Sequence, residues 1–80
     1  MEILYFALIR DWLKCGQEQI AIENPLTINE FIRIHVDPRL DGRNIDNFLF
    51  AVNEELVDKS FILGDDDTLA ILPPLSGGML

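Results

Sequence analysis

The chain has 80 residues, of which 49% are apolar, and it carries 14 acidic against 6 basic side chains, a formal net charge of −8. This length and composition predict one globular domain whose core is too small to enclose a deep active site. The negative charge repels phosphate backbones and anionic lipids, so we expect no nucleic acid and no membrane among the partners. It suits a basic groove on another protein, or serves solubility alone.

The first quarter of the chain predicts two strands. Residues 2–9 are apolar after Glu2, which is typical of a strand buried on both faces and therefore central in a sheet. Residues 10–14 mix polar and apolar side chains and fit one helical turn, which Gly16 would end. Residues 18–23 alternate weakly, as an outer strand does.

A helix is predicted after Pro25. Thr27 and Glu30 have the spacing of a capping box, in which each side chain bonds the backbone of the other residue. Apolar side chains then recur at helical spacing over residues 28–36, and Asp37-Pro38 should end the helix. Residues 39–47 are polar and predict either a loop or a second short helix.

The second half of the chain predicts strands at 48–52, 56–57, 60–63 and 68–72, the third of them short and at an edge. The first and last strands of the chain are the most apolar, so both should lie in the middle of the sheet. One main helix must then cover one face of it. This order predicts an α+β fold, a β-grasp (ubiquitin-like) mixed sheet with one main helix packed on one face, over residues 1–74.

The end of the chain differs from the rest. Pro73 and Pro74 lack N–H donors and favour extended backbone, so pairing in the sheet must stop there. Ser76 is small and Gly77-Gly78 has no side chains. Residues 75–80 therefore read as a flexible tail that could enter a narrow channel on another protein, or as a frayed terminus with incidental glycines.

Three segments together resemble a known family. Residues 63–78 resemble the end of MoaD/ThiS-type sulfur carriers: a Gly-Asp turn, an apolar strand, Pro-Pro, an apolar residue, a small residue and Gly-Gly. Residues 6–10 are similar to the F-A-x-x-R segment of their first strand, and residues 50–57 to their A-V-N-x-x-x-V segment. The likeness is greatest to MoaD, the small subunit of molybdopterin synthase, and spans essentially the whole chain.

The resemblance implies a carrier that is not an enzyme alone. In this family an E1-like enzyme uses ATP to adenylate the last glycine, which then becomes a thiocarboxylate. The tail enters a MoaE-like large subunit and donates its sulfur in molybdenum cofactor biosynthesis. No bound cofactor and no metal are expected in this chain. A carrier for thiamine or another metabolite shares the tail chemistry, and a non-carrier interaction domain or ubiquitin-like modifier is a further alternative.

The resemblance also assigns the site residues. Gly78 is the reactive position and Gly77 its required neighbour. The inserted arm consists of Pro73, Pro74, Leu75 and Ser76. Phe6 and Leu72 stand where the family has apolar residues facing the partner, although both could instead belong to the core.

One departure bears on the chemistry. The family ends at Gly-Gly, whereas this chain continues with Met79-Leu80, so Gly78 has a peptide bond in place of a carboxylate. We therefore expect a protease to remove Met79-Leu80, unless the carrier function has been lost.

Other reactive side chains are read as structural. Cys15, the only cysteine, forms no disulfide within the chain; it fits a reducing, cytoplasmic location and is read as structural or incidental. His35 has no second ligand at metal spacing and should lie at a helix end. Asp65–Asp67 is read as a turn, and not as a cation site. Arg10, at the end of the first strand, is expected to contact the partner, Asp11 or the tail.

Overall fold

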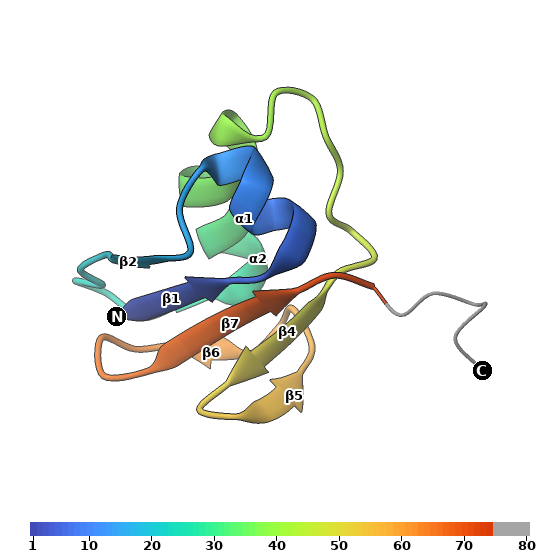
Figure 1. Cartoon of the computed structure of the whole chain (residues 1–80). Coiled ribbons are helices and arrows are strands. Elements are labelled where there is room, and N and C mark those ends of the chain that lie inside the picture. Colours follow the sequence, from blue (N-terminus) through green and yellow to red (C-terminus); the bar gives the residue numbers. More distant parts are fainter. Residues whose placement is uncertain (75–80) are drawn as a thin grey trace.

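The computed structural model describes residues 1–74 and is shown in Figure 1. Its elements are β1 (Glu2–Tyr5), α1 (Ala7–Leu13), β2 (Gln17–Gln19), β3 (Leu26–Thr27), α2 (Ile28–Phe31), the π-helix η1 (Ile32–Val36), the 3₁₀ turn η2 (Asp37–Arg39), β4 (Leu49–Val52), β5 (Glu55–Val57), β6 (Ile62–Leu63) and β7 (Thr68–Leu72).

The main sheet has five strands in the order β2-β1-β7-β4-β5, and β3 pairs with β6 in a separate sheet of two strands. Strands β1 and β7 run parallel, and the other neighbours in the main sheet are antiparallel. The first and last strands therefore lie inside the sheet, as predicted. The short strand predicted at 60–63 pairs with β3 and is not an edge of the main sheet.

The helical segment that follows β3 packs against one face of the main sheet. The capping box at its start is present, since the N–H of Glu30 donates to Thr27 Oγ1 (3.1 Å) and the N–H of Thr27 donates to Glu30 Oε1 (2.9 Å). Its buried side chains share the core with the inward residues of β1, β4 and β7; they are Ile28, Phe31, Ile32 and Val36. These features confirm the predicted α+β fold with one main helix on the sheet.

The main helix has the predicted extent, residues 28–36, but not a uniform type. Its backbone is α-helical to Phe31 and π-helical from Ile32. Asp37-Pro38 does not end the segment, because one 3₁₀ turn, η2, follows directly. Proline is tolerated in the first turn of a helix, where its missing N–H has no partner to lose. Residues 40–47 are a loop without a second helix.

The predicted strand over residues 2–9 is wrong beyond Tyr5. Phe6 is still extended, but Ala7 has a φ of 53° and turns the chain into α1. Helix α1 buries Ile9 in the core and leaves Leu8 53% exposed. A continuous apolar run carries no period, so it does not distinguish one long strand from a short strand followed by a helix. The outer strand is also shorter than predicted, three residues in place of 18–23.

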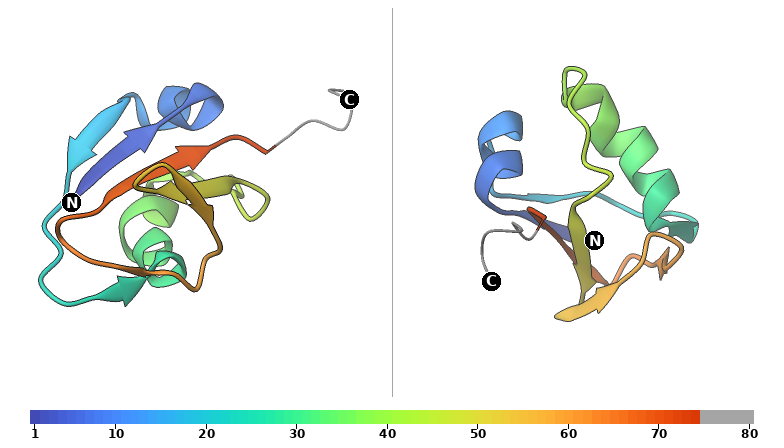
Figure 2. Two further views of the ribbon diagram at one scale, coloured as in Figure 1. Left: turned by 90° about the horizontal axis from the view of Figure 1, so that it is seen from below. Right: turned by 90° about the vertical axis from the view of Figure 1, so that its right-hand side faces the viewer.

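The arrangement of β1 and β7 decides where the chain leaves the sheet. Because the two strands are parallel, the end of β7 lies beside the end of β1 and the start of α1 (Figures 1 and 2). Pro73 is half-buried and Pro74 is exposed. The predicted tail, residues 75–80, lies outside the described residues.

Candidate functional site

The main sheet has a second face, opposite the one that α2 covers, which we call the open face. Side chains along a strand point alternately to the two faces of a sheet. In β7, Leu69 and Ile71 are fully buried in the core, whereas Thr68, Ala70 and Leu72 are only half-buried and belong to the open face. The strand register gives its apolar members as Leu4, Phe6, Leu49, Ala51, Leu56, Ala70 and Leu72.

The open face is apolar where β7 ends. Leu72 is paired with Leu49 of β4, and Phe6 follows the last paired residue of β1 on the other side of β7. Phe6 is 42% exposed, a high value for an aromatic side chain on a small domain. These three residues form the first row across the sheet, next to Pro73.

The second row is also apolar and crosses four strands. Leu4 is paired with Ala70, Ala70 with Ala51, and Ala51 with Leu56. Leu56 is 67% exposed. Two adjoining rows of apolar side chains are more than scattered surface residues, and contiguous apolar patches mark interaction sites.

The third row is polar and lies at the opposite end of β7. Glu2 is paired with Thr68, and the two-residue turn Asn53-Glu54 between β4 and β5 lies beside them. Both turn residues have positive φ, 51° and 74°, as in type I′ hairpins. The N–H of Thr68 donates to Asn53 Oδ1 (3.0 Å), and Asn53 Nδ2 donates to Asp67 Oδ1 (2.9 Å). These bonds join the β4–β5 turn to the turn between β6 and β7, which ends at Asp67.

A shallow hollow of about 690 Å³ runs along the open face through all three rows. It is lined by Glu2, Leu4, Phe6, Asn53, Glu54, Thr68, Ala70 and Leu72. The chain leaves the sheet at Leu72-Pro73, at one end of this hollow. A surface that fits the hollow would therefore lie next to the start of the tail.

The structure brings two of the predicted site residues together. Phe6 and Leu72 line the same hollow, and neither belongs to the buried core, so the alternative of ordinary core residues does not hold. Pro73 and Pro74 follow directly after Leu72. Leu75, Ser76, Gly77 and Gly78, the other predicted site residues, lie outside the described residues, as does Met79-Leu80.

Sequence reasoning missed the rest of the hollow. Leu4 and Ala70 belong to the open face, but Leu4 was read as part of a strand buried on both faces. Strand β1 in fact buries only Ile3 and Tyr5 and leaves Glu2 and Leu4 half-buried. The alternation of residues in β1 and β7 was the signal that could have separated the two faces.

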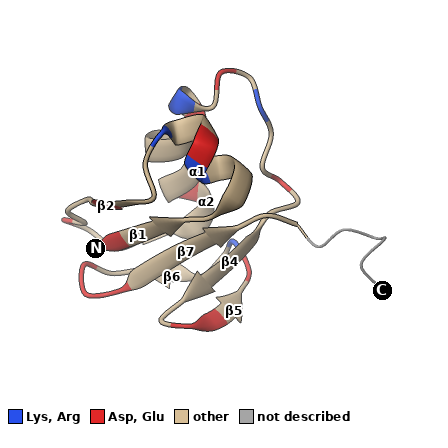
Figure 3. Cartoon of the chain, viewed as in Figure 1, with Lys and Arg blue, Asp and Glu red and all other residues tan. Residues whose placement is uncertain are grey.

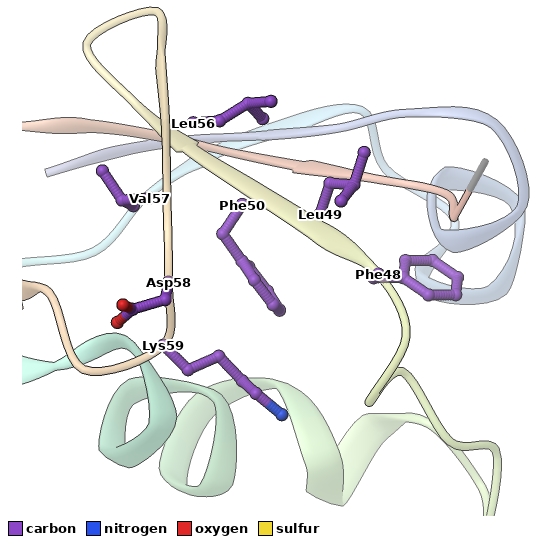
Figure 4. A pocket seen from close by; sticks show the side chains of 7 residues that line it. All are labelled: Phe48, Leu49, Phe50, Leu56, Val57, Asp58 and Lys59. Carbon is purple, nitrogen blue, oxygen red and sulfur yellow. The ribbon is translucent and has the colours of Figure 1, made fainter.

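A smaller hollow of about 210 Å³ lies at the edge formed by β4 and β5 (Figure 4). Figure 4 shows Leu49 and Leu56 on one side of the sheet, whereas Phe50 and Lys59 point toward the helix. Lys59 Nζ lies 3.9 Å from Asp46 Oδ1. This hollow contains none of the predicted site residues, but the view shows that Leu49 and Leu56 extend the open face.

A polar cluster joins β1, β2 and η2. Arg39 Nη2 donates to Glu18 Oε2 (2.5 Å) and to the Tyr5 hydroxyl (3.0 Å), and that hydroxyl donates to Glu18 Oε2 (2.5 Å). The hydrogen bond from Arg39 lowers the pKa of Glu18, and burial raises the pKa of Tyr5. Every polar group in this cluster has a partner, which points to a structural role.

The remaining reactive side chains are engaged in the fold. Asp65 Oδ1 accepts from the N–H of Ile22 (2.9 Å) and from the N-terminal amino group (3.2 Å), which lowers its pKa. Asp67 accepts from the N–H of Gly64 (2.8 Å), so the aspartate run is a turn, as predicted. The ring of His35 lies 4.8 Å from that of Phe31.

Cys15 is half-buried and packs against the core. Arg10 lies in α1 and not at the end of a strand, and it forms no ion pair with Asp11 in the described part of the chain. Within residues 1–74, no three His, Cys, Asp or Glu side chains gather so as to hold a metal ion. None of the helices in that part has the length and apolar character needed to span a membrane.

Comparisons with known proteins agree with this architecture. The molybdopterin synthase sulfur carrier subunit of Dictyostelium discoideum is 30% identical over 84 residues, which cover 96% of this chain and 94% of that protein. SAMP1 from Haloferax volcanii has a TM-score of 0.75 at 23% identity, with 98% of both chains covered. A complex of subunits 1 and 2 of molybdopterin-converting factor from Helicobacter pylori contains a chain with a TM-score of 0.64 at 23% identity, with 96% of both chains covered.

The two solved structures show the fold, a ubiquitin-like β-grasp, and the family model shows the relationship. The model of the ThiS family matches residues 3–78, nearly the whole chain. This match confirms the resemblance drawn from the three short segments. The chain belongs to the ThiS family.

Proposed function

We propose that this chain is the sulfur carrier subunit of a molybdopterin synthase. The family match carries the proposal, because it extends through the tail to Gly78, the residue to which the family's chemistry would be assigned. The Dictyostelium relative bears the name of such a subunit. The apolar open face supplies a surface for a larger partner directly beside the start of the tail.

The proposed chemistry takes place at the carboxylate of Gly78. The carboxylate oxygen attacks the α-phosphorus of ATP on an E1-like enzyme, which forms an acyl adenylate and releases pyrophosphate. The sulfur of a donor then attacks the acyl carbon and the acyl C–O bond breaks to release AMP, because the phosphate of AMP is a far better leaving group than the oxide ion of a free carboxylate. With hydrosulfide as the donor this substitution gives the thiocarboxylate directly, with loss of one proton; with a persulfide it gives an acyl disulfide, whose S–S bond a thiol reductant must then cleave. This chain needs no catalytic base or metal, since its partner enzymes supply them.

The arm from Pro73 to Gly77 would deliver that group. Pro73 and Pro74 keep the backbone extended, and the small residues that follow allow entry into a narrow channel of a MoaE-like large subunit. The complex of subunits 1 and 2 from Helicobacter pylori supports a partner of this kind. Phe6 and Leu72 would contact the large subunit around the mouth of the channel. We place the reaction in the cytoplasm, where a protein with a single free thiol is expected.

Met79-Leu80 must be removed first, and the family match, which stops at Gly78, supports this step. A chain that ends at Gly78 and the full-length chain form a matched pair. Each is incubated with ATP, the E1-like enzyme and a sulfur donor, and the intact mass is measured. We expect the mass gain of one oxygen-to-sulfur exchange in the shorter chain only.

Other masses would point to other functions. A lysine-linked adduct would identify a protein modifier, and no change in either chain would identify a non-carrier domain. If the thiocarboxylate forms but its sulfur passes to a thiamine precursor and not to a pterin, the carrier belongs to another pathway. The mass of the protein isolated from its native host tests the trimming: a purely full-length species in cells with an active pathway would contradict it.

A further inference from the structure

The hollow on the open face is apolar at the end nearest the tail and acidic at the opposite end. Leu72 and Phe6 border it near the tail, and Glu2 and Glu54 border it at the other end. Leu72 lies four residue steps along β7 from Thr68, which corresponds to about 13 Å of strand. None of the described residues that line the hollow is Lys or Arg.

The acidic end is reinforced by its surroundings. The turn between β6 and β7 adds Asp66 and Asp67, whereas Asp65 is paired with the N-terminal amino group, and Asp67 is held against the β4–β5 turn by Asn53. Figure 3 shows acidic residues at the start of β1 and at both turns, whereas the basic residues lie mainly on the helices and in the loop that follows them. The carboxylate of Glu2 accepts a hydrogen bond from Gln17, which restrains it at the edge of the open face.

We propose that this gradient fixes the orientation in which the large subunit docks. An apolar side chain of the partner would lie against Leu4, Ala70 and Leu72, and an Arg or Lys of the partner would lie at the acidic end, near Glu2 and Glu54. Complementary charge selects orientation and speeds association more than it adds affinity. The inference rests on the proposed function, because it names the surface of the same partner that receives the tail.

Orientation matters because the tail is short. Residues 75–78 span at most about 14 Å when fully extended, which is close to the length of the hollow. A partner docked in the reverse direction would carry the mouth of its channel away from Pro74 and out of reach of Gly78. A purely apolar surface would not distinguish the two directions, whereas a charged end disfavours the wrong one.

The test compares charge reversals that change the net charge equally. Glu54→Lys together with Glu2→Lys alters the acidic end of the hollow. Glu55→Lys together with Asp37→Lys is the matched control, because neither residue lines the hollow, Glu55 is paired with the core residue Val52, and Asp37 lies in η2, after the main helix. Association with the large subunit from the same organism is measured by stopped-flow fluorescence at low and at physiological salt, and folding is checked by thermal unfolding.

We expect the Glu2/Glu54 variant to associate at least tenfold more slowly at low salt, with a weaker dependence on salt, while the control stays within about threefold of the original chain. Equal slowing in both variants would show that net charge alone acts, and would overturn the proposal, as would an unchanged rate in the Glu2/Glu54 variant. If the unaltered chain ending at Gly78 does not associate at all, the proposed function fails together with the inference.

Discussion

The N–H of Phe6 donates to the carbonyl oxygen of Ile71 over 3.2 Å, one residue beyond the last paired residue of β1. This bond extends the parallel ladder and holds Phe6 beside Leu72, where β7 is about to end at Pro73. The aromatic ring therefore borders the point at which the chain leaves the sheet. The Phe6 side chain is 42% exposed, and a partner that docks on the open face would cover it.

Replacing Leu72 or Phe6 with Asp should weaken association with the large subunit. Each carboxylate would be buried in the complex without a partner, which is costly. We expect a loss of affinity on the order of 100-fold, equal to about 2.7 kcal/mol. The measurement is isothermal titration calorimetry with chains that end at Gly78.

The control for this change is Ile62→Asp. Ile62 is 62% exposed and belongs to β6, outside the main sheet, so the same substitution there adds the same charge away from the open face. It should leave the affinity within about twofold. Equal losses at Ile62 and Leu72, or no loss at Leu72, would show that the open face is not the contact surface.

The turn at Ala7 makes a second prediction, about stability. Ala7 has a φ of 53°, a left-handed conformation that costs a residue with a Cβ about 1–2 kcal/mol. Glycine avoids that cost but loses more entropy on folding, about 0.5–1 kcal/mol. Ala7→Gly should therefore raise the free energy of unfolding by about 0.5 kcal/mol, measured by urea denaturation.

Ala7→Val is the complementary change. A β-branched side chain is poorly tolerated at positive φ, so the free energy of unfolding should fall by about 1 kcal/mol or more. A valine variant as stable as the glycine variant would mean that residue 7 does not hold this conformation in solution.

This turn also shows where reasoning from the sequence stops. The segment 28–36 was predictable, because its capping box and its helical spacing are local signals that agree with each other. Alanine at residue 7 gives no sign of a left-handed conformation, which is usually marked by Gly or Asn. The apolar run through residues 2–9 therefore hid the end of a strand, a turn and the start of α1, so the helical turn predicted at residues 10–14 begins earlier, at Ala7.

The candidate site was predictable in part, for a different reason. Phe6 and Leu72 came from the resemblance to a family, since their apolar character alone does not separate a core residue from a contact residue. Two further residues belong to the site because of how the strands pair. Leu56 of β5 is paired with Ala51 of β4, and Glu54 lies in the β4–β5 turn, beside Thr68. The β4–β5 pairing is local, because a two-residue turn joins the strands, but the pairing of β4 with β7 links segments that are far apart in the sequence and is set by tertiary structure.

The capping box gives a third prediction. Thr27→Ala removes the hydroxyl that accepts from the N–H of Glu30, and it leaves that donor to water. Loss of an N-cap of this kind should lower the free energy of unfolding by about 1 kcal/mol. Thr27→Ser keeps the oxygen and should cost much less. Chemical denaturation of the two variants side by side decides whether the cap or the methyl group is responsible.

The cluster of Tyr5, Glu18 and Arg39 predicts a loss of stability both in acid and in alkali, each through a different residue. The hydrogen bond from Arg39 lowers the pKa of Glu18 in the folded chain below that of a free glutamate, about 4.3. The stability that Glu18 contributes is therefore present at neutral pH and is lost as the pH falls through the folded pKa. Glu18→Gln should be less stable than the original chain at pH 7, and the difference should shrink below about pH 4.

Tyr5 acts at the other end of the pH range. Burial raises the pKa of its hydroxyl, whereas the same group in the unfolded chain ionises near pH 10. Above about pH 10 the unfolded chain binds fewer protons than the folded one, so stability falls as the pH rises. Tyr5→Phe should remove this alkaline loss, and Glu18→Gln should not. The midpoints of urea unfolding at pH 3, 7 and 10.5 separate the contributions of the two residues.

The Glu18 prediction has its own contrary outcome. If the loss of stability in Glu18→Gln stays constant from pH 7 to pH 3, Glu18 contributes no stability that depends on its ionisation. Asp65, Glu30 and Asp58, whose pKa values are also lowered, do not affect that comparison, because both chains contain them.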